Sequence, residues 1–94
     1  MIDVTVVLTA RDLASVAELR VLLRTQRDLS LAEPGCLRFE AYESESLPGT
    51  FILIERWRSQ ESLDVHRTAH AFTTVYAPKV LPLVDRIPHV CKSL

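Results

Sequence analysis

Thr50-Phe51-Ile52-Leu53-Ile54-Glu55-Arg56-Trp57-Arg58 is the most informative run in this 94-residue chain, because it carries apolar side chains on both faces of one expected strand. Neighbouring residues of a β-strand point to opposite faces of the sheet. Leu53 therefore shares a face with Glu55 and Trp57, while Ile52 and Ile54 lie on the opposite face. A sheet with helices on one side needs apolar residues on that side only. The pattern predicts that both faces of this strand are covered.

A second copy of the same sheet is the simplest cover for the face that carries Ile52 and Ile54. The alternative is that the two side chains stay exposed, as single surface aliphatics often do. A short chain buries a smaller fraction of its surface than a larger domain, so burial against a partner favours the first arrangement. We expect a homodimer in which two sheets pack face to face.

The segment before this strand predicts a strand followed by a helix. Residues 2–10 alternate apolar and polar side chains and are rich in β-branched residues, which is typical of a strand. Asp12 is placed to cap a helix in which apolar residues recur at three- and four-residue steps as far as Leu31. Glu33-Pro34-Gly35 ends this helix, because the proline disfavours helix before it and the glycine permits a turn.

A hairpin follows the turn. Leu37, Phe39 and Ala41 alternate with polar residues and predict a second strand with these three side chains on one face. Ser46-Leu47-Pro48-Gly49 is a turn signal, and it joins this strand to the one over residues 50–58.

The last part of the chain predicts a second helix and an edge strand. Ser59 is placed to cap a helix whose character continues, with a break near His70, to Tyr76. Two prolines that follow limit regular helix, because proline has no backbone donor. Residues 86–92 alternate weakly, and Pro88 indicates an edge position.

The order of these elements is β-α-β-β-α-β, which is the split βαβ pattern. The sequence therefore predicts a single α+β domain over residues 1–94 with a ferredoxin-like fold, a four-stranded antiparallel sheet with helices on one face.

Composition excludes several classes of function. The formal net charge is -1, which gives no electrostatic case for nucleic acid or for an anionic membrane surface. No apolar run approaches the length that spans a bilayer, and the opening Met-Ile-Asp carries no basic segment of the kind that begins a signal peptide. Cys36 and Cys91 do not make a disulfide framework and are expected as free thiols in a reducing compartment, the cytoplasm.

Two blocks of residues carry a family signature. The first is Glu33-Pro34-Gly35-Cys36-Leu37-Arg38-Phe39-Glu40; the second runs from Phe51-Ile52-Leu53-Ile54-Glu55-Arg56-Trp57 through Ser59-Gln60-Glu61-Ser62-Leu63 to His66. In this order and spacing they resemble the antibiotic biosynthesis monooxygenase (ABM) domain family. The resemblance covers nearly the whole chain.

The resemblance implies a dimeric α/β barrel, with one pocket per subunit between the sheet and the helices. Known members include cofactor-independent monooxygenases of quinols and polycyclic phenols, haem-degrading enzymes and an isomerase. It therefore implies a small aromatic or quinol-like molecule as the ligand, with no cofactor.

The chain departs from the family in having no asparagine, and Leu53 stands where some monooxygenases place one. Haem degradation is disfavoured for the same reason.

Three residues are the main candidates for chemistry. His66 is the candidate proton acceptor, because an imidazole can take a proton near neutral pH; the alternative is a hydrogen bond within the fold. Removing a phenolic proton makes an electron-rich anion that, in the family's chemistry, passes an electron to dioxygen without a metal or flavin. Trp57 is the candidate stacking wall for the substrate, or else part of the core or a dimer contact. Glu55 is placed to orient a histidine or fix a helix end, or else to form an ion pair at the dimer interface.

Other side chains are candidates for the pocket lining, although aromatic residues at helical spacing commonly pack in cores. These candidates are Phe39, Tyr42, Leu53, Glu55, His70, Phe72 and Tyr76. His70 follows His66 by four residues, a spacing that suits two metal ligands. Arg67 stands where a zinc-protease motif has a glutamate and no third ligand is evident, so no metal is predicted.

The remaining arginines and Cys36 are expected to have structural roles. Arg38 and Arg56 could steady an oxyanion from their strands, but a solvated position is the simpler interpretation. Arg20, Arg24 and Arg27 are predicted to form a solvated helix face. Cys36 is interpreted as a packing residue, because no base is placed behind it.

Three functional hypotheses follow. The first is a cofactor-independent monooxygenase of a quinol or phenolic aromatic, with His66 as proton acceptor and Trp57 as stacking wall. The second is an isomerase of a small carbonyl compound that uses the same histidine. The third is a non-catalytic dimeric protein that binds a small molecule. A requirement for dioxygen separates the first from the second.

Overall fold

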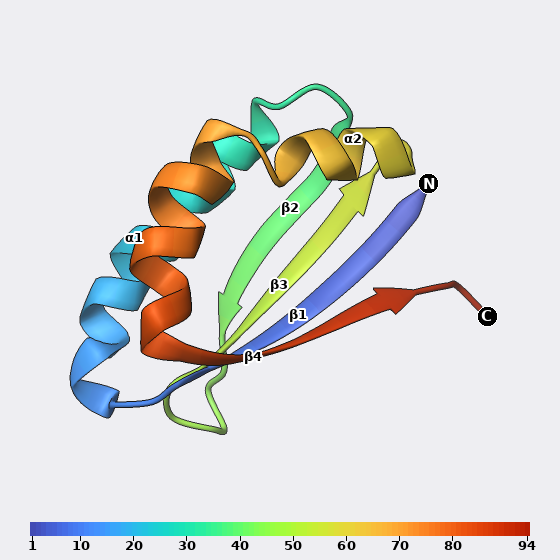
Figure 1. Cartoon of the computed structure of the whole chain (residues 1–94). Coiled ribbons are helices and arrows are strands. Elements are labelled where there is room, and N and C mark those ends of the chain that lie inside the picture. The colour runs from blue at the N-terminus through green and yellow to red at the C-terminus, as the bar shows by residue number, and fades with distance from the viewer.

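A four-stranded antiparallel sheet in the order β2-β3-β1-β4 forms one layer of the protein. The computed structural model describes residues 1–94 (Figure 1). The strands are β1 (Ile2–Ala10), β2 (Cys36–Glu43), β3 (Thr50–Trp57) and β4 (Val84–Cys91). The ferredoxin-like α+β fold and the edge position of the strand with Pro88 are confirmed.

The helices form a second layer on one face of the sheet (Figure 1). The two long segments lie side by side across it. They are α1 (Val16–Leu31) and η2 (Ala71–Val80). A short 3₁₀ turn, η1 (Leu13–Ser15), precedes α1. The helix α2 (Gln60–His66) precedes η2, and the 3₁₀ turn η3 (Leu81–Leu83) follows it. No helix is long and apolar enough to cross a membrane.

The alternation in β3 determines which side chains reach the helices. Phe51, Leu53, Glu55 and Trp57 are all buried on the helix side. They meet Val4, Val6 and Leu8 of β1, together with apolar residues of α1 and η2, in one core. The prediction that Glu55 and Trp57 share a face with Leu53 is confirmed.

The opposite face of the sheet carries an apolar row that crosses all the strands. Strand pairing aligns Tyr42 with Ile52, Ile52 with Val7, and Val7 with Ile87. Tyr42 is 50% exposed and Ile87 is 58% exposed, while the two central side chains are half-buried. We call these four residues the open-face row. Arg56 bonds to Asp3 on the same face, at 2.7 Å, so this arginine points away from the helices.

Two details differ from the sequence-based predictions. Leu37 was expected beside Phe39, but the register of β2 shifts between Cys36 and Arg38 and leaves Leu37 46% exposed. The second helix ends at His66, and the chain rewinds as a π-helix that continues through Pro78. This wide winding is visible in the bond from the Leu81 backbone N–H to the Tyr76 carbonyl, five residues back.

Gly35, in the turn between α1 and β2, occupies a position that only glycine fits. Its φ is +82°, and a Cβ placed there would lie 2.6 Å from the Ser62 Cβ and closer still to the Ser62 hydroxyl. Its carbonyl accepts a bond of 2.8 Å from the Arg58 backbone N–H. The glycine therefore allows this turn to sit directly against α2.

Gly35→Ala should lower the free energy of unfolding by about 2–4 kcal/mol, because it adds a clash with the Ser62 Cβ and hydroxyl to the cost of a positive φ. Gly49→Ala is the matched control: φ is +78°, but the first obstacle is the end of the flexible Leu13 side chain. It should lose only about 1 kcal/mol. Urea denaturation measures both, and equal losses would show that the contact with Ser62 is unimportant.

Candidate active site

His66 is the centre of the candidate site, and the local sequence fixes its position at the end of α2. Ser59 begins this helix, with its hydroxyl accepting a bond of 3.2 Å from the Ser62 backbone N–H. The helix is only seven residues long, and His66 is its last residue. The His66 side chain points into the protein, and the residue is only 4% exposed. The imidazole is thus held inside the protein.

A carboxylate from the turn after α1, 33 residues earlier in the chain, holds one nitrogen of this imidazole. Glu33 lies in the turn after α1, and its Oε1 is 2.7 Å from His66 Nδ1. Both side chains are nearly buried, at 14% and 5% exposed. When Glu33 accepts the Nδ1 proton, Nε2 carries the free lone pair, so this pairing selects the tautomer that can accept a proton at Nε2.

Trp57 packs against the imidazole of His66. The two ring centroids are 4.3 Å apart with the planes tilted by 32°. The indole N–H donates to Glu55 Oε1 at 3.0 Å, and Trp57 is completely buried. The face expected to stack on a substrate is therefore occupied by His66. Trp57 is not among the residues that line the cavity beside His66, so its predicted role as a stacking wall stays a prediction.

A small cavity of about 30 Å³ opens beside His66 between the sheet and the helices. It is large enough for a water molecule or two but not for an aromatic ring. Phe72 and Tyr76 of η2 fill much of the space, with their ring centroids 5.3 Å apart and Phe72 edge-on to His66. The cavity is lined by Val4, Gln26, Glu55, Leu63, His66, Arg67, Phe72, Tyr76 and Arg86.

Glu55 is a carboxyl group held in a largely apolar setting. Burial raises its pKa above the ordinary value of 4.5, because the ionised form loses its water. The bond from Trp57 and the nearby charges of His66 and Arg86 oppose this shift only in part. Glu55 is therefore more readily protonated than an exposed glutamate.

Arg86 and Tyr76 form a second polar pair in the cavity wall. The Arg86 Nε–H donates to the Tyr76 hydroxyl oxygen at 2.7 Å, and the guanidinium also lies 5.8 Å from the centre of the Tyr76 ring. Burial raises the pKa of Tyr76, with Arg86 partly opposing the shift. The phenol thus stays protonated near neutral pH, and the arginine brings positive charge to the cavity.

Gln26 is a buried polar side chain with an unused acceptor. It is 2% exposed, and its Oε1 has no hydrogen-bond partner. A buried oxygen without a partner costs about 1–3 kcal/mol. A ligand donor, such as a phenolic hydroxyl, would relieve that cost at the cavity wall.

The family is established by comparison with known proteins. A family model described as antibiotic biosynthesis monooxygenase (ABM) matches residues 1–77, which span most of the chain. The chain belongs to the ABM family. The match includes both sequence blocks and the residues of the cavity except Arg86.

Three known proteins illustrate what this chain is similar to. Rv0793 from Mycobacterium tuberculosis is 27% identical with a TM-score of 0.86, and the alignment covers 100% of this chain and 96% of that one. SnoaB from Streptomyces nogalater, a cofactor-independent oxygenase, is 12% identical with a TM-score of 0.84 over 98% and 91% of the two chains, so its likeness concerns the fold alone. The uncharacterized protein sll1783 from Synechocystis is 37% identical over 49 residues, 52% of this chain and 33% of the relative. The chain spans about a third of that relative's length.

The structure brings together only some of the site residues expected of this ABM protein. His66, Glu55, Phe72 and Tyr76 meet at the cavity. Phe39 and Leu53 are buried in the core without reaching it, and Tyr42 lies at the far edge strand. His70 is exposed, because the chain turns between α2 and η2 and carries it away from His66.

Three residues at this site were missed by the sequence analysis. Gln26 interrupts the apolar stripe of α1, and that interruption was a usable signal. Glu33 belongs to the first family block but was interpreted only as part of a turn. Arg86 is contributed by β4, and nothing in its local sequence distinguishes it from a surface arginine.

Glu55→Gln should become increasingly stabilising as the pH rises above 4.5, the ordinary pKa of a glutamate. Because burial raises the pKa of Glu55, the folded protein holds this proton more tightly than the unfolded chain, and wild-type stability falls as the pH rises above that value. Glutamine keeps an acceptor for Trp57 but cannot ionise. The free energies of unfolding of both proteins, from urea titrations at several pH values, measure the difference.

Glu43→Gln is the control. The bond from Arg20 lowers the pKa of Glu43 below its ordinary value of 4.5, so this group is ionised in both the folded and the unfolded protein at higher pH. Glu43→Gln should therefore be less stable than wild type by a constant amount above about pH 5, and this difference should shrink only at pH values below 4.5. If Glu55→Gln and wild type kept a constant difference across the range, Glu55 would not be a destabilised buried acid.

Proposed function

We propose that this ABM protein is a cofactor-independent monooxygenase of a quinol or phenolic aromatic, with His66 as the proton acceptor. The observation that carries the proposal is the buried Glu33–His66 pair, which directs a free imidazole nitrogen into the protein beside a cavity. The oxygenase activity named for SnoaB, a protein of the same fold, agrees with this chemistry.

In the proposed reaction His66 Nε2 takes the phenolic proton, and Glu33 balances the imidazolium that results. The Arg86 guanidinium faces the new oxyanion from the cavity wall and stabilises its charge. The anion passes one electron to dioxygen, and the two radicals combine. One oxygen atom ends in a carbonyl on the ring and the other leaves as water, so the substrate loses two hydrogens and gains one oxygen.

Trp57 acts in this proposal as a positioning residue. Its ring lies against the imidazole, and a cation gains stability over an aromatic face, so the indole supports the protonated form of His66. The substrate enters where Phe72 and Tyr76 now pack, and it requires these side chains to move, because the present cavity is smaller than an aromatic ring.

An isomerase of a small carbonyl compound is the second candidate. The observation in its favour is that a base and a readily protonated acid, His66 and Glu55, line the same cavity. Such a pair can remove a proton from one carbon and return one to another atom. This reaction needs no dioxygen, so anaerobic incubation separates it from the monooxygenase.

We also propose that the protein works as a homodimer joined through the open-face row. Tyr42, Ile52, Val7 and Ile87 form a band across the sheet that no helix covers. A second copy placed on this band would bury the same residues from both subunits, as a two-fold interface requires. The two unpaired cysteines agree with a reducing compartment, and we propose the cytoplasm.

His66→Ala should lower the rate of oxygen uptake with an accepted hydroquinone or naphthol by at least about 100-fold, the usual worth of a positioned general base. A panel of such phenols, followed with an oxygen electrode, first identifies the substrate. Glu33→Gln should lower the rate less, because it weakens the tautomer preference and leaves the base in place. His70→Ala is the matched control and should react like wild type, since His70 is exposed.

Three outcomes would contradict this proposal. An unchanged rate in His66→Ala would remove this residue from the mechanism. Turnover that continues under nitrogen would favour the isomerase, and a substrate that binds to both proteins without turnover would favour the non-catalytic binding protein.

Ile52→Asp should convert the dimer to a monomer at micromolar concentration, because it places a charge at the centre of the apolar interface. Light scattering measures the mass. Val65→Asp is the control, since Val65 is 52% exposed on α2, in the helical layer. A wild-type protein that is already monomeric would contradict the dimer.

A further inference from the structure

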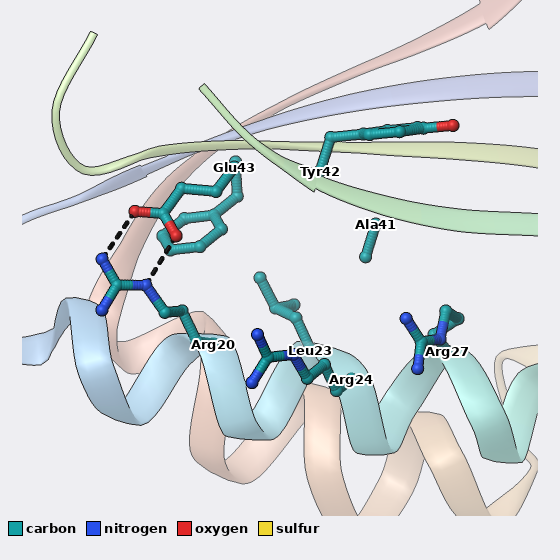
Figure 2. Close-up of a pocket in the computed structure, with 8 residues that line it drawn as sticks. Arg20, Leu23, Arg24, Arg27, Ala41, Tyr42 and Glu43 are labelled. Carbon is teal, nitrogen blue, oxygen red and sulfur yellow. Dashed lines mark hydrogen bonds and ion pairs between the residues drawn. The ribbon is translucent and has the colours of Figure 1, made fainter. Parts of the chain in front are cut away.

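A second hollow lies on the other side of α1, between this helix and the edge strand β2 (Figure 2). Its volume is about 100 Å³, larger than that of the cavity at His66, and the two hollows share no residue. We call it the arginine groove. It is lined by Arg20, Leu23, Arg24, Arg27, Ala41, Tyr42, Glu43 and Phe51.

Positive charge is concentrated in this groove. The guanidinium groups of Arg20, Arg24 and Arg27 rise from successive turns of α1 toward β2 (Figure 2). Glu43 is the one acidic residue among the lining residues, so one carboxylate faces three guanidinium groups. The chain as a whole carries a formal charge of -1, so the groove is positive on a protein that is slightly negative.

The internal partners leave part of this charge free. Arg20 is satisfied by Glu43, which accepts from its Nε at 2.6 Å and from its Nη2 at 2.9 Å. Arg27 bonds through Nε alone to the exposed Asp28 at 2.9 Å, so its terminal nitrogens remain available. Arg24 takes part in no ion pair. Two guanidinium groups, one helical turn apart, therefore face the groove with donors to spare.

The floor of the groove is apolar. Leu23 and Phe51 are buried beneath the guanidinium groups, and Ala41 is half-buried beside them. Figure 2 shows Leu23 between the arginine side chains. The groove thus combines a cationic rim with a surface suited to the flat apolar part of a small molecule.

We propose that the arginine groove binds the phosphate group of a small phosphorylated molecule, with Arg24 and Arg27 as its ligands. A carboxylate carries one charge and is satisfied by one guanidinium, as Glu43 is by Arg20. A phosphate monoester carries nearly two charges and three acceptor oxygens, so it can engage two guanidinium groups at once. The apolar floor then holds the ring or chain to which the phosphate is attached.

Titration with inorganic phosphate and with phenyl phosphate tests this site, followed by the amide shifts of the labelled full chain at constant ionic strength. Shifts should concentrate on residues 20–27 and 41–43, and phenyl phosphate should bind more tightly than inorganic phosphate because its ring covers the apolar floor. Arg24→Gln should weaken binding about fivefold, the worth of one partly exposed ion pair. The double variant Arg24→Gln/Arg27→Gln should show no saturable binding.

Two further variants complete the test. Glu43→Gln should tighten binding, because it frees Arg20 and removes the one competing carboxylate. Arg58→Gln is the control for general loss of positive charge and should bind like wild type, since Arg58 is exposed outside the groove. All of these side chains except Glu43 lie on helix or turn surfaces where glutamine is tolerated.

Saturable binding by the double variant at wild-type strength would overturn the proposal. An equal loss in Arg58→Gln would also overturn it, because the effect would then be one of net charge. Absence of saturable binding to wild type would do the same. None of these results depends on the reaction at His66, because the groove shares no side chain with that cavity.

Discussion

The hydrogen bond between Glu33 and His66 depends on one close crossing of the chain, and the rest of the site depends on that crossing. The turn after α1 runs directly against the start of α2, where Gly35 leaves no room for a side chain beside Ser62. The Gly35 carbonyl is bonded to the Arg58 backbone N–H at 2.8 Å, which ties the turn to the end of β3. Glu33, two residues before the glycine, then reaches the imidazole at the other end of α2. The turn is therefore both a structural junction and the support of the proposed base.

The charges around His66 are arranged so that a proton can be accepted without creating an isolated charge. Glu33 lies against Nδ1, on the side away from the cavity, and balances an imidazolium at a distance of 2.7 Å. Glu55 is also near, and burial raises its pKa, so a second negative charge is disfavoured in the same apolar space. Trp57 joins the two by donating to Glu55 and stacking on His66. Replacing one of these groups therefore changes the setting of the others, and their effects should not be additive.

The alternation of side chains along β3 was enough to place Glu55 and Trp57 on the same face as Leu53, because successive residues of a strand point to opposite faces. It could not show which ring Trp57 would contact, since that depends on where α2 ends in space. Leu37 was misplaced because a register shift in β2 leaves no mark in the alternation of residue types. His70 was grouped with His66 because a spacing of four residues can place two side chains on one helical face, and the turn that separates α2 from η2 moves it away. Arg86 comes from β4 and joins Tyr76 only through the tertiary fold, so local sequence carried no signal for it.

Helix α1 serves two separate sites because its polar residues fall on two different faces. Gln26 points inward with the apolar stripe and reaches the cavity, whereas Arg27, the next residue, belongs to the arginine groove. Consecutive residues on a helix are about 100° apart, so adjacent positions can reach different sites without sharing contacts. Tyr42 is different, because it belongs both to the groove lining and to the open-face row. The Tyr42 side chain points away from the arginines of the groove (Figure 2), so a substitution there would disturb the interface, whereas one at Arg24 would disturb the ligand site. The separation of these surfaces is what allows assembly, anion binding and chemistry to be tested one at a time.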